Sequence, residues 1–220
     1  MKAQEERTRR KRGSLTDEEI LNAAENVAAS SEDAITMRAV AARLGASPMA
    51  LYRYFPTKED LVDSLVDRVL QRVPVPIAGD WEQRLRQLSL AHGRVLADHP
   101  WAIGPLFASP SPGIGAARLG ESFLAILAEG GLKGHDGVAA FTAVLALNYG
   151  RTAFGVTAID DELPPLPAEH FPHSAASAAA LASYASQGNY EGALDLLLAG
   201  IGARGRAGEA GPAAAAGPAS

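Results

Sequence analysis

The chain has no cysteine among its 220 residues, so it can form no disulfide and offers no thiolate to a metal ion. Its five histidines show none of the tight spacings that zinc sites use. No apolar stretch approaches the roughly 18 residues needed to cross a bilayer. The first residues are basic and polar, which is not the pattern of a secretory signal. We therefore expect a soluble, cytoplasmic protein with no membrane partner.

Signature motifs of several enzyme classes are also missing. The sequence contains no GxSxG nucleophile elbow, no phosphate-binding GxxxxGK[ST] loop and no HExxH zinc motif. A lone serine, histidine and aspartate in a helical chain of this length are expected by chance. We therefore predict that the protein is not an enzyme, and that it has no catalytic residues, no metal ion and no cofactor.

The net charge of −5 argues against a nucleic-acid partner, but the charge is distributed unevenly along the chain. Residues 1–58 contain ten Lys and Arg against eight Asp and Glu, a balance of +2, whereas residues 59–220 contain ten against seventeen, a balance of −7. A basic end joined to an acidic body fits attraction to DNA phosphates. The basic arm near the N-terminus offers Arg10 and Arg12 as candidate DNA contacts, unless it is a solvated tail with no defined partner.

The first third of the chain carries clear signals for the starts and ends of helices. Thr16 and Glu19 have the spacing of a capping box, in which each side chain accepts a hydrogen bond from the backbone of the other residue. Thr36 is a suitable cap for a second helix, and Gly45 is a suitable end for it. The sequence therefore predicts two helices before residue 46.

A third helix is predicted to begin directly after this glycine. Ser47 can cap it, and Pro48 suits its first position because proline lacks the amide hydrogen that is unpaired there anyway. Pro56 ends this helix, and Thr57 with Asp60 caps a connecting helix over residues 58–72. Two short helices joined by a glycine turn form a helix-turn-helix, whose second helix fits the major groove of DNA.

The rest of the chain keeps the apolar period of helices. Beyond a break at residues 74–80 we predict helices over residues 81–98, 100–108, 115–130, 135–158, 174–187 and 190–204. No segment alternates with the period of a strand, so the predicted fold class is all-α. Residues 160–173 form a Pro-rich acidic segment that we predict to be a loop, and the low-complexity residues 205–220 a disordered tail.

The exposed start of the second short helix is the predicted DNA-reading surface. Its candidate contacts are Ser47, Pro48, Met49, Ala50, Arg53 and Tyr54. Arg38 can reach a phosphate or a guanine edge, and the hydroxyls of Tyr52 and Tyr54 can bind phosphates. Lys58 lies in the first turn of the next helix, where free amides favour an anion. Two structural alternatives stay open: Tyr52 belongs to the core, or Arg38 and Arg53 pair with nearby carboxylates.

The run LGASPMALYRYFPTKEDLVDSLVD resembles the tetracycline-repressor (TetR) family of bacterial transcriptional regulators. The pattern L-G-x-S-x-x-x-L-Y-x-Y-F-x-x-K-E-x-L covers Leu44 to Leu61. The later segments WEQRLRQLSLAHGRVLADHPW and GALDLLLAGI resemble the C-terminal domain of that family. The resemblance implies an all-helical chain, in which three N-terminal helices bind DNA and a larger core binds an effector and dimerises.

The DNA contacts of the family carry over by position to two helix starts and to the first turn of the helix that follows. They fall on Thr36, Met37, Arg38, Ser47, Pro48, Met49, Ala50, Tyr52, Tyr54 and Lys58. The sequence departs from many relatives at Met49 and Ala50, where polar residues that read bases are common. These two side chains can touch a thymine methyl but form no bidentate hydrogen bonds. Sequence specificity is therefore expected from Arg38, Arg53, DNA shape and the basic arm.

The resemblance also implies an effector pocket in the C-terminal helices. Its candidate lining residues are Trp101, Phe107, Phe123, Phe141, Asn148, Tyr149, Arg151 and Phe154. Each aromatic residue among them is alternatively an ordinary core residue. Effector binding is expected to move the connecting helix at residues 58–72 and so to change the spacing of two recognition helices in a dimer.

Dimerisation is expected to use the helix over residues 135–158 and the last helix. The last helix has an apolar stripe of Leu194, Leu197, Leu198 and Ile201. We predict that this stripe packs against a second copy in a four-helix bundle, with an intramolecular core as the alternative.

These observations predict four segments and one function. The segments are a basic arm at 1–13, a helix-turn-helix DNA-binding domain at 14–60, an effector-binding and dimerisation domain at 61–204, and a disordered tail at 205–220. The predicted function is that of a repressor, which binds a palindromic double-stranded DNA operator as a homodimer and is released by an unidentified small-molecule effector. An activator or an effector-independent regulator is an open alternative. A more distant one is a helical small-molecule-binding protein or enzyme with a vestigial DNA module.

Overall fold

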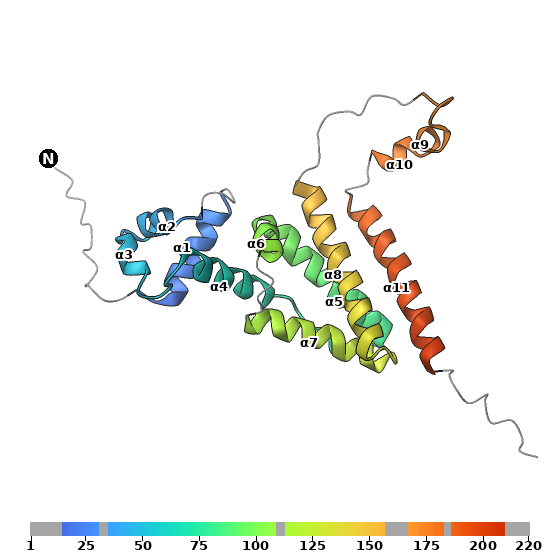
Figure 1. Ribbon diagram of the computed structural model, residues 1–220, viewed down its shortest axis with the longest axis horizontal. Coiled ribbons are helices and arrows are strands. Elements are labelled where there is room, and N and C mark those ends of the chain that lie inside the picture. The colour runs from blue at the N-terminus through green and yellow to red at the C-terminus, as the bar shows by residue number, and fades with distance from the viewer. Residues whose placement is uncertain (1–14, 31–34, 109–112, 157–166, 183–185, 210–220) are drawn as a thin grey trace, which may run out of the picture. The chain divides into compact units, whose positions relative to one another are not determined.

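The computed structural model describes residues 15–30, 35–108, 113–156, 167–182 and 186–209 of the chain (Figure 1). All regular structure in these residues is helical, and none of them forms a strand, which confirms the predicted all-α fold. None of the described helices is both long and apolar enough to cross a membrane. The chain divides into two compact units, Met1–Leu65 and Val66–Ser220. Their boundary lies within a helix, a few residues beyond the predicted boundary at 60/61.

The first unit contains three helices and the start of a fourth. They are α1 (Asp17–Ala28), α2 (Met37–Leu44), α3 (Pro48–Leu51) and α4 (Lys58–Leu70), which continues into the second unit. The capping box of α1 is present: Thr16 Oγ1 accepts from the Glu19 amide at 3.2 Å, and Glu19 Oε2 accepts from the Thr16 amide at 3.1 Å. Local sequence signals therefore place α1 as predicted.

The turn between α2 and α3 also follows the prediction. Gly45 ends α2 with φ 65° and ψ 29°, a left-handed conformation that glycine adopts without a Cβ penalty. Ser47 is the N-cap of α3, but its side chain makes no capping hydrogen bond. Leu51, at the end of α3, is fully buried and fixes the helix on the unit's core. This packing turns the opposite face of α3 outward.

Helix α4 begins with the predicted reciprocal cap. Thr57 Oγ1 accepts from the Asp60 amide at 3.0 Å, and Asp60 Oδ2 accepts from the Thr57 amide at the same distance. Its apolar side chains from Leu61 to Leu70 are buried, except that of Val62, which is half-buried. The connecting helix therefore ends at Leu70, slightly short of the predicted residue 72.

The second unit is a larger bundle. Its elements are α5 (Trp81–Asp98), the 3-10 helix η2 (Pro100–Ala102), α6 (Ile103–Ala108), α7 (Ile114–Glu129), α8 (Gly134–Val156), α9 (Pro172–Ala176), α10 (Ala178–Leu181) and α11 (Gln187–Glu209). Helix α5 packs against α7, α8 and α11, and α7 packs against α8 (Figure 1). Fully buried side chains at Leu88, Phe123, Val144 and Leu194 form the centre of this bundle. The core therefore lies around α5.

Two predictions about the C-terminal elements were wrong. The helix predicted over residues 174–187 is two short helices, because Ser177 leaves the helical conformation between them with φ −101° and ψ 5°. The last helix reaches Glu209, so residues 205–209, predicted as part of a disordered tail, are helical. Ion pairs hold this end in place: Arg204 contacts Asp136 at 2.8 Å, and Arg206 contacts Glu82 at 2.7 Å.

The last helix contains one run that resembles a nucleotide-binding motif. Residues 200–205 read GIGARG, which has the letters of the dinucleotide-binding pattern GxGxxG. That pattern binds phosphates only at a turn between a strand and a helix. Here it lies inside α11, so the local structure that the motif requires is missing.

Candidate DNA-binding surface and effector site

The outward face of α2, α3 and the start of α4 carries most of the predicted DNA contacts. Exposed members are Thr36, Arg38, Ser47, Pro48, Met49, Tyr52, Arg53 and Lys58, whereas Ala50 and Tyr54 are half-buried. Met49 is 73% exposed, an unusual position for a large apolar side chain on an isolated unit. Arg10 and Arg12 lie outside the described residues. Eight of the predicted contacts of the helix-turn-helix are therefore exposed to solvent.

Met37 is the exception among these residues. Its side chain is only 5% exposed and belongs to the core of the first unit. It is the first residue of α2, where the helical period turns its side chain inward toward Val40 and Ala41 rather than outward with Arg38. The prediction of a DNA contact was therefore wrong for the Met37 side chain, and only its backbone remains at the helix start.

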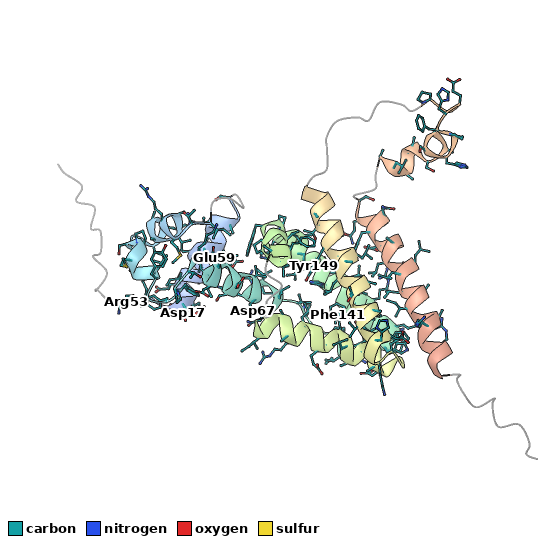
Figure 2. The ribbon with its side chains drawn as sticks, in the orientation of Figure 1. Asp17, Arg53, Glu59, Asp67, Phe141 and Tyr149 are labelled. Carbon is teal, nitrogen blue, oxygen red and sulfur yellow. The ribbon has the colours of Figure 1, made fainter. Side chains whose placement is uncertain are left out.

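The structural alternatives for three residues are not supported. Tyr52 is 44% exposed, so it is not a core residue. Arg38 and Arg53 form no ion pair with any carboxylate in the part of the chain that the structure describes. Arg53 lies two residues after the end of α3, and Figure 2 labels it in the first unit. These side chains are therefore accessible to a partner.

The predicted effector residues divide by burial. Trp101, Phe123 and Asn148 are buried, Phe141, Tyr149 and Arg151 are half-buried, and Phe107 is 65% exposed. Trp101 pairs edge-on with His99, at 6.4 Å between ring centroids, and has no ring contact with the candidates whose side chains the structure describes. The side chain of Phe154 lies outside the described residues. Exposure alone thus separates core candidates from surface ones.

Four of these candidates lie in one series of aromatic rings that also contains His92. The series runs Phe107, Tyr149, His92, Phe123 and Phe141, with successive ring centroids 5.8, 5.8, 6.0 and 5.6 Å apart. Its members come from α6, α8, α5, α7 and α8 in turn. Figure 2 labels Tyr149 and Phe141 along α8. The series therefore joins an exposed ring to the buried centre of the bundle.

A buried hydrogen-bond network lies beside these rings. Asn148 Nδ2 is 3.0 Å from His92 Nδ1 and donates to the Ser89 carbonyl at 3.2 Å. The Tyr190 hydroxyl donates to Asn148 Oδ1 at 2.8 Å. The same hydroxyl oxygen lies 3.2 Å from the Ser89 carbonyl oxygen, which is its second possible acceptor. The guanidinium of Arg151 lies 4.7 Å from the centroid of the Tyr190 ring, within cation–π range. The network ties α5, α8 and α11 together.

Burial changes the protonation of two members. His92 is 1% exposed, and burial lowers the pKa of its imidazole to about 4, so the ring is neutral near pH 7. Burial also raises the pKa of Tyr190 to about 12, so its hydroxyl keeps its proton. The network at neutral pH is therefore one of uncharged donors and acceptors, apart from Arg151.

Sequence reasoning named Asn148 but missed His92, Ser89 and Tyr190 as its partners. A signal was present in α5, where His92 lies on the same helical face as Leu88 and Leu96. A polar side chain on an apolar face needs a buried partner. The identity of that partner depends on the packing of α8 and α11, which local sequence does not contain.

Replacing Asn148 with leucine tests the strength of this network. The change leaves His92 Nδ1 buried without a donor, while Tyr190 still donates to the Ser89 carbonyl. We expect the free energy of unfolding to fall by about 2 kcal/mol, measured by urea denaturation. Thr152→Val is the matched control, because among the described residues this buried hydroxyl bonds only the Asn148 carbonyl of its own helix. Its expected cost is below about 1 kcal/mol, and equal losses in the two variants would contradict the prediction.

Helix α7 has an N-terminal cap that comes from α4. Asp67 Oδ1 accepts from the Ala116 amide at 3.0 Å, in the place that an N-cap side chain would fill, and Gly113 supplies none. Gln71 donates to the other carboxylate oxygen of Asp67 at 2.9 Å. A Cβ at Gly115 would lie 2.6 Å from the Asp67 carbonyl oxygen, so only glycine allows this approach. The last turns of α4 are therefore fixed to the start of α7.

The outer sides of α8 and α11 form an apolar groove of about 420 Å³. Its apolar lining includes Leu132, Ala139, Ala140, Leu196, Leu197 and Ile201, and Arg204 and Asp136 lie at the same groove. Leu196 is 79% exposed and Val138 is 53% exposed, so large apolar side chains face outward on both helices. Both helices therefore carry exposed apolar side chains, and Leu196 lines the groove between them.

The predicted dimer stripe on α11 needs a partial correction. Leu194 is fully buried and Ile201 is 7% exposed, so these two pack within the chain, as the alternative proposed. Leu197 and Leu198 are half-buried. Leu196, which the prediction omitted, is the most exposed leucine of the helix, because the helix is rotated relative to the assumed face.

Two further predictions concern metal binding and the Pro-rich segment. Within the described ranges, no group of three His, Cys, Asp or Glu side chains could hold a metal ion. Residues 160–166, half of the Pro-rich segment 160–173, lie outside the described residues. The other half forms a turn and then enters α9 at Pro172, so the predicted loop ends two residues earlier than expected.

Comparison with known proteins places the sequence among bacterial regulators. Residues 20–65 match the family model of bacterial regulatory proteins, tetR family, and residues 73–204 match the tetracyclin repressor-like, C-terminal domain. An HTH-type transcriptional repressor of Mycobacterium tuberculosis is 31% identical over 147 residues, which are 63% of this chain and 56% of that protein. The HTH-type transcriptional repressor DrrR1 of Streptomyces coeruleorubidus is 31% identical over 134 residues, or 59% and 50% of the two chains. The chain thus spans about half the length of these curated relatives.

Solved structures show the same fold. Apo ActR from Streptomyces coelicolor superposes with a TM-score of 0.79 at 22% identity, over 88% of this chain and 97% of that one. ActR in complex with actinorhodin gives a TM-score of 0.77 at 21% identity, over 87% and 99%. A possible TetR family transcriptional regulator from the same organism gives 0.76 at 25% identity, over 86% and 100%. Both units therefore have counterparts in one known fold.

Proposed function

Because the chain belongs to the tetR family of bacterial regulatory proteins, we propose that it represses transcription by binding a palindromic operator as a homodimer. We further propose that a small-molecule effector in the helical body releases the DNA. The chain is a transcriptional regulator by family, and its curated relatives include proteins named repressors. The observation that carries the DNA-binding proposal is the exposed face of α2 and α3 beside the buried Leu51.

The chemistry of this face suits a DNA duplex. Arg38 and Arg53 supply charge and donors for phosphates or guanine edges, and Lys58 lies at the start of α4, where free amides add to the attraction. The hydroxyl of Tyr52 can bind a phosphate and fix the register. The large exposed side chain of Met49 suits contact with a thymine methyl. The proposal keeps Arg10 and Arg12 of the basic arm as further phosphate contacts.

The apolar face of α8 and α11 supports the homodimer. A palindromic operator needs two recognition helices related by a twofold axis, about 34–36 Å apart. A self-complementary apolar face supplies such symmetry, because the same patch serves both subunits. Leu196 and Val138 are the large exposed residues that a second copy would cover.

The ring series supports an effector in the body. ActR, a structural neighbour, is solved in complex with actinorhodin, which shows that this fold admits a small organic ligand in that protein. In this chain the corresponding candidates are Phe107, Tyr149, Phe123 and Phe141, joined through His92. We infer that the chain acts by binding rather than by catalysis.

The proposal is tested by selecting bound sequences from a pool of random duplexes with the full chain. Enrichment of an inverted repeat is the expected result, with an affinity that falls steeply as salt rises, because phosphate contacts release counterions. A transcription assay on the selected sequence then separates repression from activation. Salt-sensitive binding without an enriched sequence would contradict a sequence-specific regulator.

Single contacts on this face are tested by Arg38→Ala and Tyr52→Phe. Each variant should weaken binding to the selected operator by about tenfold, since each removes one hydrogen-bonded contact worth about 1–2 kcal/mol. Arg118→Ala removes an exposed arginine of α7 and should leave the affinity unchanged. Unchanged affinity in both test variants would remove this face as the DNA-binding surface.

A further inference from the structure

The centre of the bundle contains a buried nitrogen of His92 that no described residue pairs with. Within the described ranges His92 Nε2 has no hydrogen-bond partner, although the residue is 1% exposed. Its ring contacts are edge-to-face ones with Phe123 and Tyr149, and an aromatic face is only a weak acceptor. Buried polar groups in native proteins are nearly always paired, so an unpaired one needs an explanation.

The neighbouring network determines which nitrogen of His92 carries the hydrogen. The Ser89 carbonyl oxygen can only accept, so the atom of Asn148 that faces it must be the amide nitrogen. The same nitrogen faces His92 Nδ1 at 3.0 Å and donates to it. A neutral imidazole that accepts at Nδ1 carries its hydrogen on Nε2. Tyr190 completes the arrangement by donating to Asn148 Oδ1.

The surroundings of this donor limit what could accept from it. A cation is disfavoured, because the facing atom is an N–H and Arg151 lies on the adjoining side of the network. The rings of Phe123 on α7 and Tyr149 on α8 contact the His92 ring edge-to-face, and they favour a flat apolar ligand that stacks or packs edge-on. The series extends from Phe107, which is 65% exposed, through half-buried Tyr149 to His92, so packed rings reach from the surface of the bundle to this histidine.

We propose that His92 Nε2–H is the anchor of the effector site and binds a carbonyl oxygen of a planar aromatic ligand held among Tyr149, Phe123 and Phe141. This inference rests on the proposed effector-responsive function and specifies the ligand chemistry. Asn148 and Tyr190 act as positioning residues, since they hold His92 in the donating tautomer. Because the network joins α5, α8 and α11, a ligand at His92 acts directly on the two helices proposed to form the dimer.

A matched pair of probes tests this donor. Fluorenone and fluorene have nearly the same flat shape, but only fluorenone has a carbonyl oxygen. Calorimetric titration of the full-length protein should show fluorenone binding about tenfold more tightly than fluorene, equivalent to 1.4 kcal/mol. His92→Phe should remove that preference, and His173→Phe, an exposed histidine of α9, should keep it. Equal affinities, or binding of neither probe up to its solubility limit, would overturn the proposal.

A second measurement does not depend on a folded His92 variant. In protein labelled with ¹⁵N-histidine, one of the five histidines should be neutral with its hydrogen on Nε2, and fluorenone should shift that Nε2 resonance. A hydrogen on Nδ1 of the buried histidine, or no shift of its Nε2 with bound fluorenone, would overturn the proposal. Binding to the selected operator is measured in a separate assay. A negative ligand result therefore does not contradict the DNA-binding proposal, and a negative operator result does not contradict the ligand proposal.

Discussion

Replacing Leu196 with glutamate will leave a folded monomer and weaken binding to a palindromic operator by about 100-fold. Leu196 is 79% exposed on α11 beside the apolar groove that α8 and α11 share. A charge placed in a face that a second copy covers would lose its water without gaining a partner. Two linked recognition helices bind a double site far more tightly than one, by a factor of 10² to 10⁴.

The control for this prediction is Ile77→Glu. Ile77 is 93% exposed in the segment between α4 and α5. Its replacement by glutamate therefore adds the same charge at another exposed apolar position. Sedimentation equilibrium at micromolar concentration gives the oligomeric state, and fluorescence anisotropy gives the affinity for the full operator and for a half-site. A dimeric Leu196→Glu variant with unchanged affinity would remove the α8–α11 face from the proposal.

Acidification from pH 6.5 to pH 4 will lower the free energy of unfolding by about 3 kcal/mol more in the natural sequence than in His92→Phe. Burial lowers the pKa of His92 from an ordinary value of 6.5 to about 4, so the unfolded chain binds this proton more readily than the folded one. The stability that comes from a lowered histidine pKa is fully present when the pH is above the pKa of the unfolded state. It is lost as the pH falls toward the pKa of the folded state. The size of the effect follows because a tenfold difference in proton affinity between the folded and unfolded states corresponds to about 1.36 kcal/mol.

This prediction is measured by urea unfolding at a series of pH values. The carboxylates titrate in the same range, but they are common to both proteins and cancel in the difference. The Asp195 carboxyl, for example, has its pKa lowered by its hydrogen bond to Arg86 in both. Parallel pH profiles of the two proteins would show that the pKa of His92 is the same in the folded and the unfolded state, and would contradict this prediction.

The first unit was predictable because its signals are local. Thr16 with Glu19, Thr57 with Asp60, and Gly45 each act within a few residues, so their caps and turn appear in the structure where the sequence predicts them. Met37 was misjudged because family position alone does not give the rotation of a side chain at a helix start. Its 5% exposure follows from the packing of α2 in the first unit.

The second unit was predictable in its helices but not in its network. Ser89 and Tyr190 are separated by a hundred residues of chain, and their contact arises only when α5 and α11 pack together. Gly93 allows this contact, because a Cβ there would lie 2.6 Å from the Tyr190 hydroxyl oxygen. The stripe on α11 failed for the same reason: periodicity shows that a helix has an apolar side, but not which neighbour covers it.

The cap that Asp67 gives to α7 has a mechanical consequence. Because Gly115 leaves no space for a side chain between the two helices, the last turns of α4 cannot slide along the start of α7 without losing the hydrogen bond to the Ala116 amide. Under the proposed effector-responsive function, we therefore expect a shift at the start of α7 to carry the C-terminal turns of α4 with it, because the two ends share this hydrogen bond and this close approach.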